Sequence, residues 1–349
     1  MRRGRIIYHL IAGVAFGAVL AGCSMIDEDL SNCGEDLKLD YDLQLVTNVS
    51  IELQTELDRR NDANLIKALR EYLAPIFTDY AHDLDLSFYD NQGDFARLHH
   101  EQHIMDANEL SFTVYPPRRQ YQNSAVANLE RNGVVTLEGS EFCHKAHLIQ
   151  SQGDTVTPHK TGLFTARQDI HLEDGVDKTY YVHMYMANCG AALVLDTSEA
   201  SLKELKVVAT GFASRFNIAD STYVFADTPS MVVADQIKTG NSGQQCFCTI
   251  NFPSREPDAV MTRDIIETEE PFVSVDAQKA LWQFDVYATL ADGTVTKSML
   301  GVWKPLRAAQ FKILHAHMYS NGGLEPDEPE VGVSVTLDWK EGNVYNPEI

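Results

Sequence analysis

Short segments of alternating apolar and polar residues, separated by turn sequences, recur along the chain and constrain its fold most strongly. In the clearest of them, residues 37–46, every second side chain is apolar: Leu37, Leu39, Tyr41, Leu43 and Leu45. Successive side chains of a strand point to opposite faces, so this period of two indicates a strand with one buried face. Further strands are predicted at 84–89, 95–105, 110–115, 162–172, 179–186, 191–195, 205–212, 246–252, 281–290, 295–302, 311–319 and 331–339.

Helical patterns are rare by comparison. Residues 63–76 carry apolar side chains at helical spacing, with Asp62 placed to cap the N-terminus and Pro75 near the end. We therefore expect one amphipathic helix that packs over a sheet early in the chain. Residues 124–129 are expected to form a second, short helix.

Turn signals divide the strands into two blocks of similar length, which predicts a mainly β protein with two β-sandwiches. The hairpin signal Ala291-Asp292-Gly293-Thr294 falls between two of the last strands. We place the N-terminal β-sandwich domain, with the short amphipathic helix, at residues 36–187 and the C-terminal β-sandwich domain at residues 188–349.

The N-terminal segment has the order of a bacterial export signal. Three arginines among the first five residues precede an almost uncharged run, and Leu20-Ala21-Gly22-Cys23 then resembles a lipobox. We interpret residues 1–22 as a lipoprotein signal peptide and Cys23 as the acylated first residue of the mature protein. A transmembrane anchor is the alternative, but a spanning helix needs about 20 apolar residues and this run has about 15.

Residues 23–35 are acidic and lack periodicity, so we interpret them as a tether between lipid and folded body. Their Asp27-Glu28-Asp29 cluster resembles acidic patches of surface-exported lipoproteins of Bacteroidota, or is simply a solvated linker. The whole chain has a formal net charge of −22, which argues against nucleic-acid binding and against adsorption to anionic lipids. Attachment to the membrane must then come from the acyl chains.

Six cysteines occur, and lipidation of Cys23 would leave an odd number: Cys33, Cys143, Cys189, Cys246 and Cys248. Export permits disulfides, but an odd and sparse set does not describe a disulfide scaffold. We expect buried free thiols at most of these positions. A single bridge remains open, and the sequence does not identify its two partners.

Motifs that carry chemistry are weak throughout. His99-His100-Glu101-Gln102-His103 lacks the zincin spacing, but on a strand His99, Glu101 and His103 would share one face, as a surface metal site or a polar strand face. Cys246 and Cys248 would likewise share a face, which favours core packing over a zinc site. No nucleophile elbow or phosphate-binding loop occurs, so we expect neither an enzyme nor a cofactor.

The dibasic pair Arg59-Arg60 stands in a polar break after the first strand. Exposed dibasic loops are accessible to proteases. The alternative interpretation, two solvated cations before a helix, is the one we favour.

Taken together, these features resemble one known family. After the lipobox, CSMIDEDLSNCGEDLKLDYDLQLVTN is similar to the start of the FimB-type fimbrial anchor lipoproteins of Bacteroidales, with an acidic tether, a cysteine about ten residues on, and an alternating first strand. YYVHMYMAN and a closing strand ending in Leu337-Asp338-Trp339 match more loosely.

The resemblance implies two tandem transthyretin-like β-sandwiches on a lipid-anchored protein that faces outward from the outer membrane. It also implies a cell-adhesion role, in which the protein anchors a fimbria and limits its length. The implied partners are the fimbrial shaft pilin, received by β-strand addition, and accessory tip subunits.

Two other functions stay open. Related shaft pilins lose lipid and first strand together when a trypsin-like protease cuts after an arginine, so cleavage at Arg59-Arg60 would indicate a shaft or tip subunit. A glycan-binding surface lipoprotein is the other alternative. It would expose aromatic platforms, whereas Trp282, Trp303 and Trp339 all lie in strand patterns.

Overall fold

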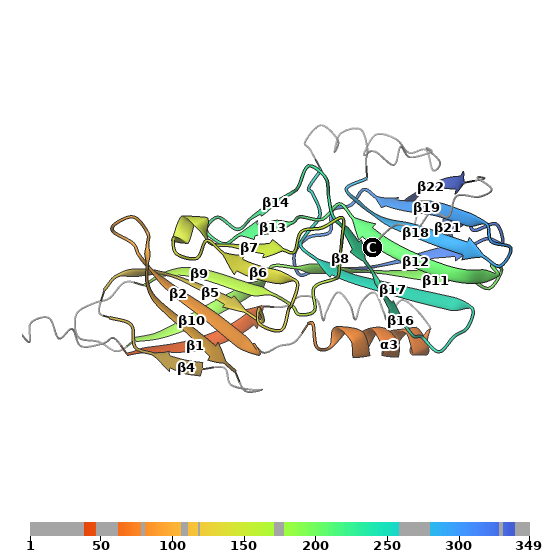
Figure 1. The fold of residues 1–349 in the computed structure, drawn as a ribbon. Helices are drawn as coiled ribbons and strands as arrows, with labels where there is room; N and C mark the ends of the chain where they lie inside the picture. Colours follow the sequence, from red (N-terminus) through yellow and green to blue (C-terminus); the bar gives the residue numbers. More distant parts are fainter. Residues whose placement is uncertain are drawn as a thin grey trace, which may run out of the picture.

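The computed structural model describes residues 38–46, 62–77, 81–105, 111–117, 119–170, 178–257, 280–327 and 331–338. Strands dominate these residues and form four sheets, of seven, four, five and six strands (Figure 1). Within these ranges the only helices are α3 (Ala63–Leu73) and the single 3-10 turn η2 (Cys143–Lys145). The expectation of a mainly β protein is confirmed.

The seven-stranded sheet has the order β3-β2-β5-β9-β10-β1-β4. Its strands are β1 (Leu39–Val46), β2 (Asp83–Asp90), β3 (Arg97–Ile104), β4 (Ser111–Val114), β5 (Tyr121–Ala127), β9 (Phe164–Ile170) and β10 (Lys178–Met186). β9 and β10 share only two register pairs, and apolar side chains from both sides of that joint meet in one buried cluster. The edge strands also approach each other, with the rings of His103 and Phe112 5.0 Å apart. The sheet therefore folds over on itself as a β-sandwich.

A second sandwich follows from residue 189 onward. Its five-stranded sheet has the order β16-β17-β11-β20-β21, with β11 (Cys189–Asp196), β16 (Asp235–Ile237), β17 (Gln244–Asn251), β20 (Phe311–Met318) and β21 (Leu324–Pro326). The six-stranded sheet has the order β22-β19-β18-β12-β15-β8, with β8 (Thr155–Val156), β12 (Leu202–Thr210), β15 (Met231–Val233), β18 (Trp282–Leu290), β19 (Val295–Val302) and β22 (Val331–Asp338). Trp282, Phe284 and Leu193 are among the buried side chains between the two sheets.

The helix α3 begins as predicted, because the Asp62 carboxylate accepts hydrogen bonds from two backbone N–H groups of the first turn, at 3.0 and 3.1 Å. Its position differs from our expectation. We assigned the helix to the N-terminal sandwich, but it covers the outer face of the five-stranded sheet, which later residues build (Figure 1). Its buried leucines lie against that face: Leu65, Leu69 and Leu73.

This position explains the composition of the five-stranded sheet. Because α3 covers one face and the six-stranded sheet covers the other, seven consecutive residues of β11 are buried. Strands buried on both faces have continuous apolar runs, not alternation. Cys246 and Cys248 share the face that packs on α3, so the prediction that both belong to the core is confirmed.

The four-stranded sheet takes strands from both halves of the chain. Its order is β14-β13-β7-β6, with β6 (Val135–Glu138), β7 (His147–Gln150), β13 (Arg215–Asn217) and β14 (Thr222–Val224). Side chains from both halves also share its apolar cluster, Leu148 from β7 and Phe216 from β13 among them. In the same way, β8 pairs in parallel with β15 of the six-stranded sheet. Backbone pairing therefore joins the two halves directly.

A buried polar network lies where β10 leads into β11. The Asn188 side chain donates to the Thr161 carbonyl (2.9 Å), and its oxygen accepts from the backbone N–H of Leu163 (3.2 Å). His159 is fully buried beside it, with ring nitrogen Nδ1 3.5 Å from Asn188 and its ring 4.8 Å from that of Phe252. Burial lowers the pKa of His159 to about 3, so the imidazole is neutral near neutral pH.

The structure contains strands at all of the predicted positions, with ends shifted by a few residues. The helix predicted at residues 124–129 is wrong, since residues 121–127 form β5. β5 lies between β2 and β9, and its two faces contribute to different apolar clusters, with Ala125 on one side and Val126 on the other. A short run that is apolar on both faces has no period, so its sequence does not distinguish strand from helix.

Candidate functional site: the first strand and the open sheet edges

The first strand is built into the sheet on both sides. All eight residues of β1 pair in parallel with β10, from Leu39↔Lys178 to Val46↔Tyr185. On the other side its first four residues pair with β4, from Leu39↔Val114 to Asp42↔Ser111. Without β1, β4 would lose its neighbour and β10 would become an edge. β1 therefore completes this layer of the sandwich.

Side chains at the start of β1 hold the strand in register. Leu39 and Val114 are both buried in the apolar cluster, at 1% and 0% exposure. On the opposite face the Asp40 carboxylate accepts a hydrogen bond from the Thr113 hydroxyl at 2.6 Å and pairs with Lys38 at 3.1 Å. The bond from Thr113, followed by the bond from Lys38, lowers the pKa of Asp40.

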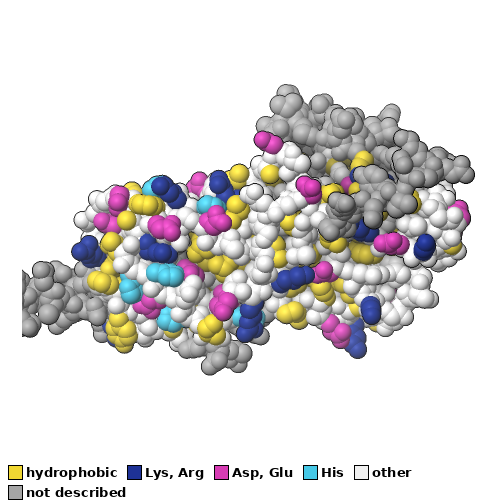
Figure 2. Space-filling view, in the orientation of Figure 1, with side chains coloured by type: hydrophobic (Ala, Val, Ile, Leu, Met, Phe, Trp, Pro, Cys, Tyr) yellow, Lys and Arg dark blue, Asp and Glu magenta, His cyan; other side chains and the backbone are white. Residues whose placement is uncertain are grey.

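Open sheet edges provide a second kind of surface. The edge strand β3 pairs with β2 on one side. On the other side, as far as the structure describes the chain, only its first residue, Arg97, donates a backbone hydrogen bond, to the Glu141 carbonyl at 2.8 Å. Leu98 and Ile104 of this strand are exposed. In Figure 2 hydrophobic, charged and histidine side chains are interspersed over this end of the molecule. An unpaired edge with exposed apolar side chains can accept an added strand.

The histidine cluster lies on β3 as predicted, with His99, Glu101 and His103 on one half-buried face. The two Glu101 oxygens are 2.6 Å from His99 Nε2 and 2.9 Å from His103 Nε2. Over the part of the chain that the structure describes, no group of three or more His, Cys, Asp and Glu side chains is arranged to hold a metal ion. The cluster is therefore a half-buried polar strand face, whose two histidines are held by Glu101.

Four of the cysteines that we expected as thiols are buried and free: Cys143, Cys189, Cys246 and Cys248. The expectation is confirmed for these four. Burial raises the pKa of each of them above the usual range of a thiol. Cys33 lies outside the described residues.

The predicted lipidation residue Cys23 and the predicted protease-accessible pair Arg59 and Arg60 also lie outside the described residues. Their roles stay predictions. The nearest described residue after the pair is Asp62, which caps α3 and also accepts a hydrogen bond from Gln244 at 3.1 Å. The chain is therefore held in place from two residues after Arg60.

No protein family and no curated protein sequence matches the chain. Solved structures do match it. A candidate adhesin from Bacteroides ovatus aligns with 88% of this chain and 97% of its own, at 11% identity and a TM-score of 0.51. The two proteins share one fold.

Other solved structures are similar at lower scores. The fimbrial anchor protein Mfa2 from Porphyromonas gingivalis aligns with 86% of this chain and 98% of its own, at 10% identity and a TM-score of 0.48. A candidate cell adhesion protein from Bacteroides eggerthii aligns with 87% and 96%, at 10% identity and a TM-score of 0.48.

At 11% identity, the likeness to the Bacteroides ovatus protein concerns the fold alone. The shared fold covers 88% of this chain. Among the described residues no helix is long and apolar enough to cross a membrane.

Sequence analysis missed two features of the structure: the packing of α3 on the second sandwich, and a polar cavity beside β8 and β15. Both are assembled from segments far apart in the chain.

Proposed function

We propose that the protein is a lipid-anchored surface protein of the outer membrane that roots a fimbria in the cell and limits its length. It has a structural role, without enzymatic activity or cofactor. The lipobox that ends at Cys23 and the resemblance of residues 23–48 to FimB-type anchors support this proposal. The Bacteroides ovatus protein that shares this fold is a candidate adhesin, which is a surface role of the same kind, and this also supports the proposal. We assign the two sandwiches as transthyretin-like domains, at residues 36–187 and 188–349.

The place of β1 is the observation that carries the proposal. β1 pairs with β10 along its whole length and with β4 over its first half, so it is an integral strand of the sandwich. The same strand leads back to Cys23 through residues 24–38. A protein that keeps β1 in place therefore stays covalently joined to its acyl chains. Tension on a docked fimbria then reaches the membrane through the folded body.

The shaft pilin is received at an open sheet edge by β-strand addition, with accessory tip subunits as further partners. Main-chain hydrogen bonds supply affinity in this mode, and alternate side chains supply specificity. β3 is suited to it, because from Leu98 to Ile104 the alternate residues whose backbone groups point away from β2 have no strand partner within the described part of the chain.

Protein purified from outer membranes is expected to begin at an acylated Cys23 and to keep the mass of the whole mature chain. Cys23→Ala is expected to release the protein from the membrane, whereas Arg59→Ala/Arg60→Ala is expected to leave its mass and location unchanged. Mass spectrometry and N-terminal analysis of the three proteins provide the measurement. A start at Arg60 or Asn61 in the parent would contradict the anchor and identify a matured shaft or tip subunit.

Removing the gene tests the function itself. Cells without the protein are expected to shed long fimbriae, because shaft growth continues without a terminating anchor. Electron microscopy and the quantity of fimbriae in the medium measure this. Fimbriae of unchanged length and attachment, together with lost polysaccharide binding, would instead favour a glycan-binding surface lipoprotein.

A further inference from the structure

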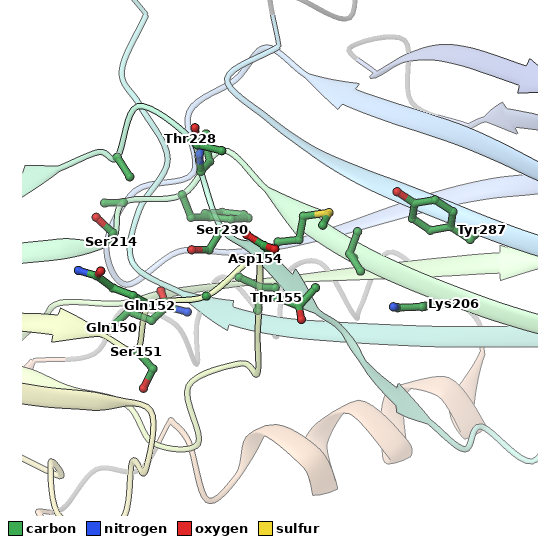
Figure 3. Close-up of a pocket in the computed structure, with 18 residues that line it drawn as sticks. Gln150, Ser151, Gln152, Asp154, Thr155, Lys206, Ser214, Thr228, Ser230 and Tyr287 are labelled. Carbon is green, nitrogen blue, oxygen red and sulfur yellow. The ribbon is translucent and has the colours of Figure 1, made fainter. Parts of the chain in front are cut away.

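A cavity of about 690 Å³ lies on the outer face of the six-stranded sheet, beside β8 and β15. Its floor comes from β12 and β18, and its walls are the loops that precede β8 and β15. Figure 3 shows its polar side chains spread along its length, with Gln150, Gln152 and Ser214 at one end and Lys206 and Tyr287 at the other. This volume falls within the range of small-molecule sites.

One lining residue lacks the partner that its burial demands. Gln150 at the end of β7 is 5% exposed, and its buried amide nitrogen Nε2 has no hydrogen-bond acceptor among the residues that the structure describes. A buried amide donor without a partner has lost its hydration without compensation, which destabilises the fold. Such a group calls for an explanation, and a ligand that supplies the missing acceptor is one. Gln150 is therefore a candidate ligand-binding residue.

Other polar groups along the cavity are also available. The side chains of Gln152, Asp154 and Lys206 form no hydrogen bond or ion pair within the described part of the chain. Partial burial lowers the pKa of Lys206, which indicates that its ammonium group is incompletely hydrated. The lining thus presents amides, hydroxyls, one carboxylate and one ammonium group to the same space.

The aromatic ring at one end is held in position. Tyr287 lies on β18 with the Lys297 ammonium group 5.3 Å from its ring centre. That ammonium group is itself bound to the buried Asp285 carboxylate at 2.9 Å. A cation over the ring and an ion pair behind the cation leave Tyr287 few alternative positions. The cavity therefore combines a fixed aromatic surface with unpaired polar groups.

We propose that this cavity binds a neutral oligosaccharide, with Gln150 hydrogen-bonded to a ring or hydroxyl oxygen of one unit and Tyr287 packed against the C–H face of another. Sugar hydroxyls donate and accept, as the amides and hydroxyls of the lining do. An apolar ligand would leave these groups buried and unpaired. Asp154 and Lys206 carry opposite charges, so the lining has no net charge that would favour an anion or a cation. The inference is independent of the anchoring role.

The test uses the mature chain and a panel of probes: the neutral trisaccharides maltotriose, mannotriose and triacetylchitotriose, the anionic sugar N-acetylneuraminic acid and trialanine. Saturation-transfer NMR and calorimetry are expected to detect at least one neutral sugar. Gln150→Leu and Tyr287→Ala are each expected to weaken its binding at least about tenfold. Tyr181→Ala is the matched control, because Tyr181 is a tyrosine of the distant strand β10 and is 71% exposed. It should leave sugar binding unchanged.

Thermal unfolding shows whether a variant has lost a ligand or its fold. Gln150→Leu removes an unpartnered buried amide, so its unfolding midpoint is expected to equal or exceed that of the parent while sugar binding is lost. Three results would overturn the proposal: no binding of any neutral sugar, equal sugar binding by both cavity variants and the parent, or preferential binding of N-acetylneuraminic acid or trialanine.

Discussion

Replacing Leu69 by Ala is expected to lower the free energy of unfolding by about 2–5 kcal/mol. Leu69 is fully buried at the centre of α3, in the cluster that α3 shares with β17. Truncation removes apolar contacts and leaves a cavity between a helix and a sheet, two regular elements that collapse poorly onto each other. Urea unfolding followed by circular dichroism measures the change.

The same helix provides the control. Glu71 is exposed and forms only a long ion pair with Lys67, at 3.8 Å. Glu71→Ala is therefore expected to change stability by less than about 0.5 kcal/mol. If Leu69→Ala were as mild as Glu71→Ala, α3 would not cover the five-stranded sheet in solution.

Acidification is expected to destabilise the protein through His159. Its pKa is about 3 in the folded protein, below the value of about 6.5 expected after unfolding. Between these values the unfolded chain binds more protons than the folded one, so the free energy of unfolding falls as the pH is lowered. From pH 6.5 to 4.5 this difference amounts to about 2 kcal/mol.

The measurement compares the parent with His159→Phe, which keeps a ring beside Phe252 but cannot take up a proton. Urea unfolding at pH 6.5 and 4.5 is expected to show a smaller loss in the variant, by about 2 kcal/mol. Between pH 7.5 and 8.5 the two proteins should have the same pH dependence, because the imidazole is neutral in both states there. Equal losses on acidification would contradict a buried neutral His159.

Local patterns predicted the long elements because each pattern reflects burial of one face. The alternation around Leu39 and the carboxylate of Asp62 placed β1 and the start of α3 correctly. Patterns of this kind do not say what covers a buried face. For that reason the sequence did not show that Leu69 packs against strands more than 100 residues later.

Short strands and the cavity were beyond such reasoning for different reasons. β13 and β14 have three residues each, too few to show a period of two. The cavity combines the loop before β8 with the loop before β15, and a single glutamine such as Gln150 belongs to no motif. The predicted roles of Cys23, Arg59 and Arg60 rest on their sequence context alone.

The packing of α3 against the five-stranded sheet constrains the order in which the chain can fold during synthesis and export. α3 is complete by residue 73, yet the sheet that it covers includes β20, which begins at Phe311. A chain that emerges from its N-terminus therefore exposes the apolar stripe of α3 until most of its length has followed. Contacts of such sequence separation close large loops and form slowly, and the intermediate is prone to aggregate. Truncation before β20 should therefore yield insoluble protein.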